Sequence, residues 1–446
     1  MHTASSLTSG RRGSFGSPLV LGAYAVMACM LAGCGSSGGG NAAASHGAAA
    51  AVQASNGTEQ VIAATQSRLR GAPDDVHALD TLAAAYLQRV RETGDPSYYA
   101  KADELLTSAL RLAPQDGDAT LLSGMLALAR HHFADALQWG RRAAALDAHG
   151  AGPLGVVTDA LVELGRYDEA VVSVQQMVDL RPDLASYSRV SYLRELHGDV
   201  DGAITAMRLA VGAGGAVAEN VAYVEVLLGN LFFNRGDPTA AEEQYSAALR
   251  DDPGYVHATA ALARVRAAQG RWADAIAMYR SAVSVYPLAQ YVIALGDVQA
   301  ASGDAQGAAQ QYDLAAVEQQ LLSSTGGVDV DQELALFDAD HRRNLDDALA
   351  AAQRAMRDRP SVQSADVLAW TLFQRGDAPA ALDASRLAHR LGTRDALFFF
   401  HTGMIEAALG MRAQARGDLQ TALAVNPYFS VLQGAVARST LEGLSP

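Results

Sequence analysis

The chain has 446 residues, of which 50% are hydrophobic and only 6% aromatic, a composition that favours many helices packed through small side chains over one large aromatic core. Its 34 basic and 48 acidic residues give a net charge of −14 without a basic cluster, so neither nucleic acid nor an anionic membrane surface is expected as a ligand. Lys101 is the only lysine and Ala102 follows it, which excludes a GxxxxGK[ST] phosphate-binding loop.

Residues 1–33 show the pattern of an export signal. A short leading segment contains Arg11 and Arg12, and an apolar run follows from Pro18 to Leu31. The run is too short to cross a bilayer comfortably as a permanent helix. The arginine pair also allows a twin-arginine signal, although no basic residue follows the apolar run. We expect this segment to direct the chain out of the cytoplasm.

The apolar run ends in the sequence Leu31-Ala32-Gly33-Cys34. This sequence resembles the lipobox of bacterial lipoproteins, and the resemblance implies that Cys34 becomes the new N-terminus and carries acyl chains such as palmitate. Gly35, rather than Asp, follows the cysteine, which by the sorting pattern of some lipoproteins implies the periplasmic face of the outer membrane. The cell membrane is the alternative location. An ordinary cleaved signal would instead leave a soluble periplasmic protein.

Cysteine usage agrees with the lipoprotein interpretation. Cys29 and Cys34 are the only cysteines, and the first would be removed with the signal while the second would carry lipid. No disulfide could then form in an oxidising compartment. Helix packing must therefore hold the mature protein together.

Residues 34–57 are rich in Gly, Ala and Ser and contain almost no charged or large apolar side chains. Such a segment cannot bury enough surface to fold, so we expect a disordered, flexible tether. Residues 58–75 follow with an amphipathic helical pattern from Thr58 to Arg70. We expect this helix to cap the N-terminal end of the folded part.

A period of 34 residues runs through residues 58–428 and is clearest between Leu228 and Pro287. Spacings of four and three place Ala241, Tyr245 and Ala248 on one stripe of a helix. A Gly turn separates this helix from an earlier one, so each period predicts two antiparallel helices. The corresponding positions are Leu228-Gly229 and Leu262-Ala263, Gly236 and Gly270, Ala241 and Ala275, Tyr245 and Tyr279, Ala248 and Ala282, and Pro253 and Pro287.

This unit resembles the tetratricopeptide repeat, with Leu-Gly early, Ala in the middle, an aromatic residue four further, and Pro at the end. Glu225 and Thr259 stand where that family has a Trp. The resemblance implies an all-α superhelical solenoid of about ten helical hairpins, each stacked on its neighbours. Residues 429–446 would supply a C-terminal capping helix, from Phe429 to Leu441, and a tail. Units are expected to start near Val76, Gly117, Ala151, Leu184, Ala222, Val256, Ala289 and Asp329, with two more before residue 428.

Three places depart from the period. About seven extra residues lie between Tyr86 and Ala102, and they are expected to lengthen a loop or a helix end without breaking the stack. After Ala316 the pattern slips before a new unit begins. Residues 212–215 form a Gly-rich link, which is either an ordinary loop or a hinge between two parts of the stack.

A partner-binding groove is implied by the same resemblance, because ligands of tetratricopeptide repeats usually bind the concave face, which the first helix of each unit lines. Large apolar side chains on a groove mark an interaction surface, although some of them could pack against their own neighbours instead. Asn230 and Asn234 carry amides that could hold an extended peptide. Val226, His257 and Ala261 occupy positions where carboxylate-clamping family members use basic residues, so that specificity is not expected. The groove positions are Tyr192, Tyr223, Asn230, Phe233, Asn234, Arg264, Phe337, Trp370, Phe373, Phe400 and Met404.

Candidate catalytic and metal-ligating residues are few. No HExxH or CxxC pattern occurs. His131 and His132 are adjacent at a turn, where neighbouring side chains diverge, so they are not expected to bind a metal. Asp338, Asp340 and His341 form a denser cluster, which we interpret as a helix-end charge network; the alternatives are a binding contact and a catalytic site. No catalytic residue, metal site or cofactor is therefore assigned.

The expected function is that of a non-enzymatic, lipid-anchored scaffold outside the cytoplasm, which binds protein or extended peptide partners in its groove, within an envelope assembly. The expected contact with the membrane is through the N-terminal lipid only, and no small-molecule ligand is expected. The alternatives are an accessory of surface-polysaccharide synthesis or export, or of pilus assembly, because aromatic grooves can also hold sugars. The sequence leaves the partner and the oligomeric state open.

Overall fold

The computed structural model describes residues 47–215 and 217–444, and this part of the chain is built from helices without a strand. The expected all-α class is therefore confirmed. The expected export signal, the lipobox with Cys34, and the first part of the tether lie outside the described residues. None of the described helices combines the length and the apolar character that crossing a bilayer requires.

Ten antiparallel helical hairpins stack in chain order, as the repeat pattern predicted. The sequence predicted the first residue of eight units, and in six of them the first helix begins at that residue. The exceptions are α11, which begins at Ala218, and α17, which begins at Asp331. The hairpins are α3 (Val76–Thr93) with α4 (Ser97–Leu112), α5 (Gly117–Ala129) with α6 (Phe133–Leu146), α7 (Ala151–Glu163) with α8 (Tyr167–Leu180), α9 (Leu184–Leu196) with α10 (Val200–Ala213), α11 (Ala218–Asn234) with α12 (Pro238–Asp251), α13 (Val256–Ala268) with α14 (Trp272–Val285), α15 (Ala289–Ala301) with α16 (Ala305–Leu321), α17 (Asp331–Asp340) with α18 (Leu345–Asp358), α19 (Val362–Gln374) with α20 (Ala378–Ala388), and α21 (Ala396–Ala408) with α22 (Arg412–Val425).

Both ends of the stack carry one further helix, with bounds that differ from the expected ones. The N-terminal helix α2 (Gly47–Gly71) begins at Gly47 instead of Thr58, so residues 47–57 are helical and not part of a flexible tether. The C-terminal helix α23 (Gln433–Gly443) begins after Phe429, because Phe429 instead closes a turn with Asn426 and buries its ring against that of Phe400.

The irregular places leave the stack continuous. The extra residues of the first unit lengthen α3 to 18 residues, compared with 13 in α5, and Gly94 ends it in the left-handed conformation. After α16 a five-residue π-helical turn, η2 (Leu322–Gly326), absorbs the slip in period. The Gly-rich link begins inside α10, which runs to Ala213, and α10 packs against α11.

Small residues in the first helices allow the two helices of a hairpin to approach closely. A Cβ atom added at Gly229 would lie 2.3 Å from the Tyr245 ring, which is far inside van der Waals contact. The same Tyr245 hydroxyl donates to Asn230 Oδ1 at 2.8 Å. Tyr312 repeats this bond one residue after Gly296, with Asp297 as the acceptor. The Leu-Gly signature therefore marks the point where a buried tyrosine of the second helix crosses the first.

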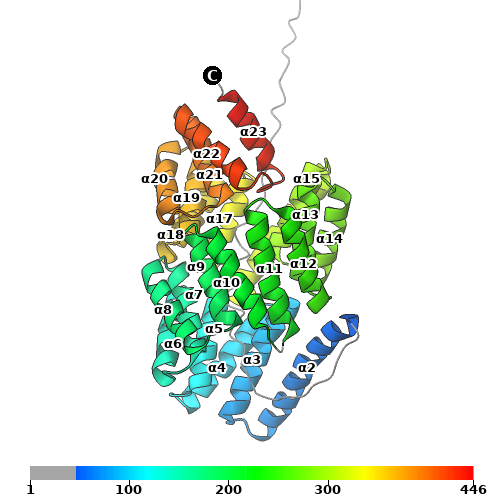
Figure 1. The fold of residues 1–446 in the computed structure, drawn as a ribbon. Helices are drawn as coiled ribbons and strands as arrows, with labels where there is room; N and C mark the ends of the chain where they lie inside the picture. Colours follow the sequence, from blue (N-terminus) through cyan, green and yellow to red (C-terminus); the bar gives the residue numbers. More distant parts are fainter. Residues whose placement is uncertain (1–46, 216, 445–446) are drawn as a thin grey trace, which may run out of the picture.

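The stack winds into a superhelix whose second turn lies directly on its first (Figure 1). Five consecutive turns between paired helices, those of the first to fifth hairpins, each meet a connecting loop much later in the chain. The residues joined by hydrogen bonds at these places lie between 195 and 199 positions apart. These bonds include Tyr286 Oη to the Val90 carbonyl (3.3 Å), Arg130 Nε to the Gly326 carbonyl (2.9 Å), Val362 N to Tyr167 Oη (2.9 Å) and Thr393 Oγ1 to the Leu196 carbonyl (2.5 Å).

The fifth turn makes its contact through packing. Gly236 lies against Val425 and Pro427, and a Cβ atom there would be 3.0 Å from the Val425 carbonyl oxygen. The two superhelical turns thus meet along a continuous line, which we call the seam. Because of the seam, the inner face of the superhelix is largely enclosed and does not form an open groove.

Candidate functional site

The predicted groove residues lie inside the packed molecule and not on an open concave face. Six are buried, with 1–7% of their surface exposed, and the remaining five are half-buried. The aromatic groove expected from the sequence is therefore not an open surface, because the seam and the neighbouring hairpins cover it. The buried six are Tyr223, Asn230, Phe233, Phe337, Trp370 and Phe400, and the half-buried five are Tyr192, Asn234, Arg264, Phe373 and Met404.

The groove residues of the last three hairpins serve packing. The Trp370 ring stacks on His401 with centroids 4.2 Å apart, and its Nε1 donates to Asp340 at 2.8 Å. Phe373 also stacks on Trp370, with ring centroids 5.2 Å apart, and the Phe400 ring lies 5.7 Å from that of Trp370. These side chains form one core cluster, so they offer no binding surface to a partner.

Two groove residues, one from the fifth hairpin and one from the sixth, line a cavity of about 200 Å³, which we call the central cavity. Its wall combines α3, the α5–α6 turn, α11, α13, α15, α16 and the loop from Leu322 to Val330. It therefore lies between the first superhelical turn and the second. Asn230 and Arg264 line it, together with His257 and Tyr291.

Polar contacts orient the wall of the central cavity. Arg264 donates to Asn230 at 2.8 Å and to Tyr245 at 2.9 Å, and its guanidinium lies 4.0 Å from the centre of the Phe233 ring. His257 Nδ1 is hydrogen-bonded to the Tyr291 hydroxyl. Burial lowers the pKa of His257 to about 4, so its ring is neutral at pH 7. Arg264 is therefore held as part of a hydrogen-bonded wall.

A second, smaller cavity of about 60 Å³ lies at the seam between α9 and α11 of the first turn and the α20–α21 link of the second; we call it the seam cavity. Tyr192 and Asn234 line it. An adjoining hollow of about 340 Å³ is lined by Asn234 with Arg235 and Arg394, both exposed. We call the seam cavity together with this hollow the seam recess. Of the predicted groove positions, Tyr192 and Asn234 are the ones that line it.

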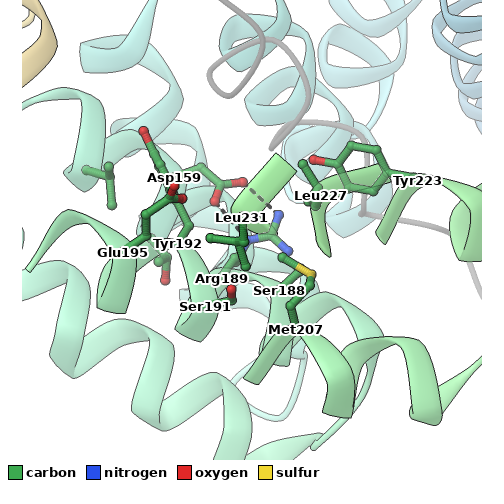
Figure 2. Close-up of a pocket in the computed structure, with 12 residues that line it drawn as sticks. Asp159, Ser188, Arg189, Ser191, Tyr192, Glu195, Met207, Tyr223, Leu227 and Leu231 are labelled. Atoms are coloured by element: carbon green, nitrogen blue, oxygen red, sulfur yellow. Dashed lines mark hydrogen bonds and ion pairs between the residues drawn. The ribbon is translucent and has the colours of Figure 1, made fainter. Parts of the chain in front are cut away.

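Tyr223 and Tyr192 also line a narrow cavity beside a buried ion pair (Figure 2). Arg189 donates to both carboxylate oxygens of Asp159, at 2.8 and 2.7 Å, and both side chains are at most 7% exposed. Such a bidentate pair ties α7 to α9 between consecutive hairpins. The cavity measures only about 30 Å³, so it has no room for a ligand larger than a water molecule or two.

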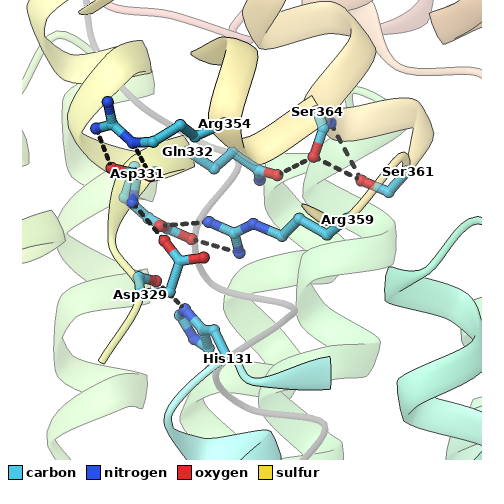
Figure 3. Close-up of polar contacts among 9 residues, drawn as sticks. His131, Asp329, Asp331, Gln332, Arg354, Arg359, Ser361 and Ser364 are labelled. Carbon is cyan, nitrogen blue, oxygen red and sulfur yellow. Dashed lines mark hydrogen bonds and ion pairs between the residues drawn. The ribbon is translucent and has the colours of Figure 1, made fainter. Parts of the chain in front are cut away.

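A cluster of buried charges lies on the seam, and sequence reasoning did not identify it as a unit (Figure 3). Arg359, 1% exposed, donates to Glu333 at 3.0 Å. His131, which has a left-handed backbone (φ 60°), binds the Asp329 carbonyl oxygen through Nδ1 at 2.7 Å. Glu163 at the end of α7 interacts electrostatically with Arg359 and Glu333. We call Glu163, Glu333, Arg359 and His131 together the seam charge cluster. Its members are far apart in sequence, so no local pattern could have revealed it.

Burial raises the pKa of Glu163 to about 7, and the nearby charges of Glu333 and Asp159 act in the same direction while Arg359 opposes them. A carboxyl group whose pKa is higher in the folded than in the unfolded state stabilises the fold below the unfolded pKa. That contribution is lost as the pH rises through the folded value. The stability contribution of Glu163 is therefore lost between about pH 4 and about pH 7.

We therefore expect the wild-type protein to lose about 2 kcal/mol more stability between pH 5 and pH 8 than a Glu163→Gln variant does. Urea unfolding of both proteins at the two pH values measures this difference. Glu59→Gln, at an exposed position of α2, is the matched control and should follow the wild type. Equal pH dependence of wild type and Glu163→Gln would contradict the assignment.

The acidic cluster near the end of α17 does not converge on one site. Asp340 accepts hydrogen bonds from Trp370 and from Gln433 Nε2 at 3.0 Å. His341 instead binds Asp297 through Nε2 at 3.0 Å. Burial raises the pKa of Asp338 to about 6. These contacts fit the interpretation of the cluster as a helix-end charge network. No group of three or more potential metal ligands occurs in the described residues.

His131 and His132 diverge as expected, since the first is buried and the second exposed.

The described part of the chain is an all-α solenoid of stacked helical hairpins. The family model described as tetratricopeptide repeat matches residues 97–151, 226–288 and 260–320, so these segments are similar to tetratricopeptide repeats. Stacked repeats of this type provide a scaffold suited to interactions with other proteins. No curated protein matches the chain.

Several solved structures are similar to the chain. The APC/C hetero-tetramer Cut9–Hcn1 matches with 14% identity and a TM-score of 0.37, covering 88% of this chain and 94% of that one. The human IFIT1 dimer with PPP-AAAA matches with 13% identity and a TM-score of 0.43, covering 78% and 89%. A tetratricopeptide repeat protein from Parabacteroides merdae matches with 17% identity and a TM-score of 0.34, covering 58% and 98%.

Proposed function

We propose that this protein is a non-enzymatic scaffold, anchored by lipid outside the cytoplasm, which binds an extended segment of a partner protein at the seam. The observation that carries the binding site is the recess beside Tyr192 and Asn234, where two half-buried polar side chains of the inner face reach an accessible surface. The other predicted groove residues are packed into the core or face the central cavity.

The chemistry of the recess favours a peptide segment. The Asn234 amide and the Tyr192 hydroxyl can each bond to a peptide backbone, and Asn234 already lies 3.4 Å from Glu195 Oε1. Arg235 and Arg394 line the adjoining hollow together with Glu195, Asp199 and Asp201, so charges of both signs are present, and Arg235 already pairs with Asp201 at 3.6 Å. An extended segment that combines backbone amides with polar or charged side chains of both signs would complement this surface.

Replacing Asn234 with arginine should block the recess by bulk while leaving the fold intact, because Asn234 is half-buried at the end of α11. Asn220→Arg is the matched control, since Asn220 is also half-buried but lies at the other end of the same helix. We expect proteins crosslinked to the wild type in envelope preparations to be retained by Asn220→Arg and lost from Asn234→Arg. An unchanged partner list for Asn234→Arg would refute the proposed site.

The proposed anchor rests on the Leu31-Ala32-Gly33-Cys34 sequence after an apolar run. We expect Cys34→Ser to abolish metabolic labelling with a palmitate analogue and to move the protein from the membrane fraction to the soluble fraction. Cys29→Ser, within the proposed signal, is the control and should leave labelling unchanged. Complete partitioning of Cys34→Ser with membranes would contradict the anchor, and this outcome is independent of the partner site.

A further inference from the structure

The central cavity has the size and wall of a small-molecule site. At about 200 Å³ it exceeds the roughly 150 Å³ of an engineered apolar cavity that binds benzene. Its wall is mainly aliphatic and aromatic, with tyrosine rings from α14 and α15 and from the link between them. Apolar walls with a few fixed polar groups are typical of ligand sites. A single substituted aromatic ring is the class of molecule that fits.

Two buried polar atoms on this wall have no hydrogen-bond partner in the protein: Nε2 of His131 and Oε1 of Gln319. Both residues are more than nine-tenths buried, with 5% and 3% exposed. A buried polar atom without a partner is costly, and a bound molecule that supplies the missing bond recovers that cost. The two atoms therefore point to a ligand that forms hydrogen bonds.

The bonding of His131 decides the kind of group the ligand must carry. Its Nδ1 lies 2.7 Å from the Asp329 carbonyl oxygen, which can only accept, so Nδ1 carries the proton. Burial lowers the pKa of His131, which keeps the ring neutral at pH 7 and leaves Nε2 as an acceptor. Gln319 Oε1 is an acceptor as well. The cavity thus needs a ligand that donates.

We propose that the central cavity binds a small one-ring aromatic molecule with a hydroxyl donor, of the phenol class, whose ring packs among the tyrosines and whose hydroxyl donates to His131 Nε2 or Gln319 Oε1. The site is distinct from the seam recess, so it can fail or succeed independently of the proposed scaffold function. It also departs from the expectation that no small-molecule ligand binds. Because its wall combines both superhelical turns, the site exists only when the seam is closed.

Calorimetric titration of the purified mature chain with p-cresol and with 4-methylanisole tests the proposal, since the two probes differ in the donor. We expect p-cresol to bind about tenfold more tightly, as one or two hydrogen bonds would provide. Gln319→Leu and His131→Asn should each reduce this preference. Leucine is close in size to Gln319, and asparagine tolerates the left-handed backbone of residue 131.

A variant that fills the central cavity gives a second test of the proposal. Ala294 lines the cavity and is half-buried, so Ala294→Phe should occupy the space and weaken binding of both probes by at least about tenfold. Ala305→Phe, at an exposed position of α16, is the control and should bind as the wild type does. Circular dichroism confirms that each variant is folded. Absence of binding by the wild type, equal affinity for the two probes, or unchanged binding by folded Ala294→Phe would overturn the proposal.

Discussion

Replacing Arg359 with alanine is expected to lower the free energy of unfolding by about 3–5 kcal/mol, because the change leaves buried carboxylates without their counter-charge. Arg359 is 1% exposed and donates to Glu333 at 3.0 Å. Its guanidinium also lies 5.8 Å from the centre of the Phe133 ring, which belongs to the other superhelical turn. The loss therefore combines an uncompensated charge with lost packing across the seam.

Two further variants separate these contributions. Arg359→Met keeps most of the apolar stem but not the charge, and combining it with Glu333→Gln removes the charge left behind. We expect the double variant to recover at least about 2 kcal/mol relative to Arg359→Met alone, since replacing both partners of a buried pair costs less than removing one. Urea unfolding curves measure all four proteins. A loss of less than about 1 kcal/mol for Arg359→Ala would show that the seam charge cluster does not stabilise the fold.

The seam itself can be tested with a pair of matched glycine substitutions. Gly165 has a left-handed backbone (φ 66°), and a Cβ atom there would lie 2.3 Å from the Pro360 carbonyl oxygen of the next superhelical turn. Gly270 has nearly the same backbone (φ 71°) at the equivalent turn of the sixth hairpin, but a Cβ atom there would meet nothing within 4 Å. Both substitutions by alanine carry the same energetic cost of a left-handed backbone, but only Gly165→Ala also creates a steric clash.

We expect Gly270→Ala to cost about 1 kcal/mol, the left-handed penalty alone. Gly165→Ala should cost about 2–4 kcal/mol, because the two superhelical turns must separate to admit the methyl group. Small-angle X-ray scattering should also give a larger radius of gyration for Gly165→Ala than for Gly270→Ala. Equal stability and equal dimensions for the two variants would mean that the turns do not touch in solution.

Much of the fold follows from local sequence. The 34-residue recurrence of small residues, tyrosines and turn glycines predicts the ten hairpins because these positions act within one hairpin or between neighbours. Gly229 and Tyr245 illustrate this: the glycine leaves the space that the ring fills. The Asp116 side chain likewise caps α5 by accepting from the Ala119 amide at 2.8 Å, a signal visible in the sequence as an Asp before the helix.

The helix ends were less predictable where packing competes with propensity. Residues 47–57 have the composition of a linker, yet they extend α2. Their many alanines favour a helix, and the rest of α2 packs against α3. At the other end Phe429 leaves the helical pattern because its ring is buried beside Phe400. Composition alone cannot weigh such contacts.

The inner face is where sequence reasoning and structure diverge. Counting positions within each unit placed Phe233, Trp370 and Phe400 on an inner face, but it could not tell whether that face is open. That depends on how far each hairpin is rotated against the next, since a small rotation accumulates over the stack. Here the accumulated rotation returns the chain to itself after about 195 residues. The expected groove is consequently divided into packed core, the central cavity and the seam recess.

The sequence by itself determined the helical hairpin, its number of copies and the tyrosine that joins its two helices, because each of these depends on residues less than one period apart. Only the tertiary structure decided the seam and what it creates: the buried pairing of Arg359 with Glu333, the raised pKa of Glu163 and the unpaired acceptor of His131. The physical reason is that these groups meet across two superhelical turns, and the relative position of the turns is the sum of many small packing rotations that no single repeat records.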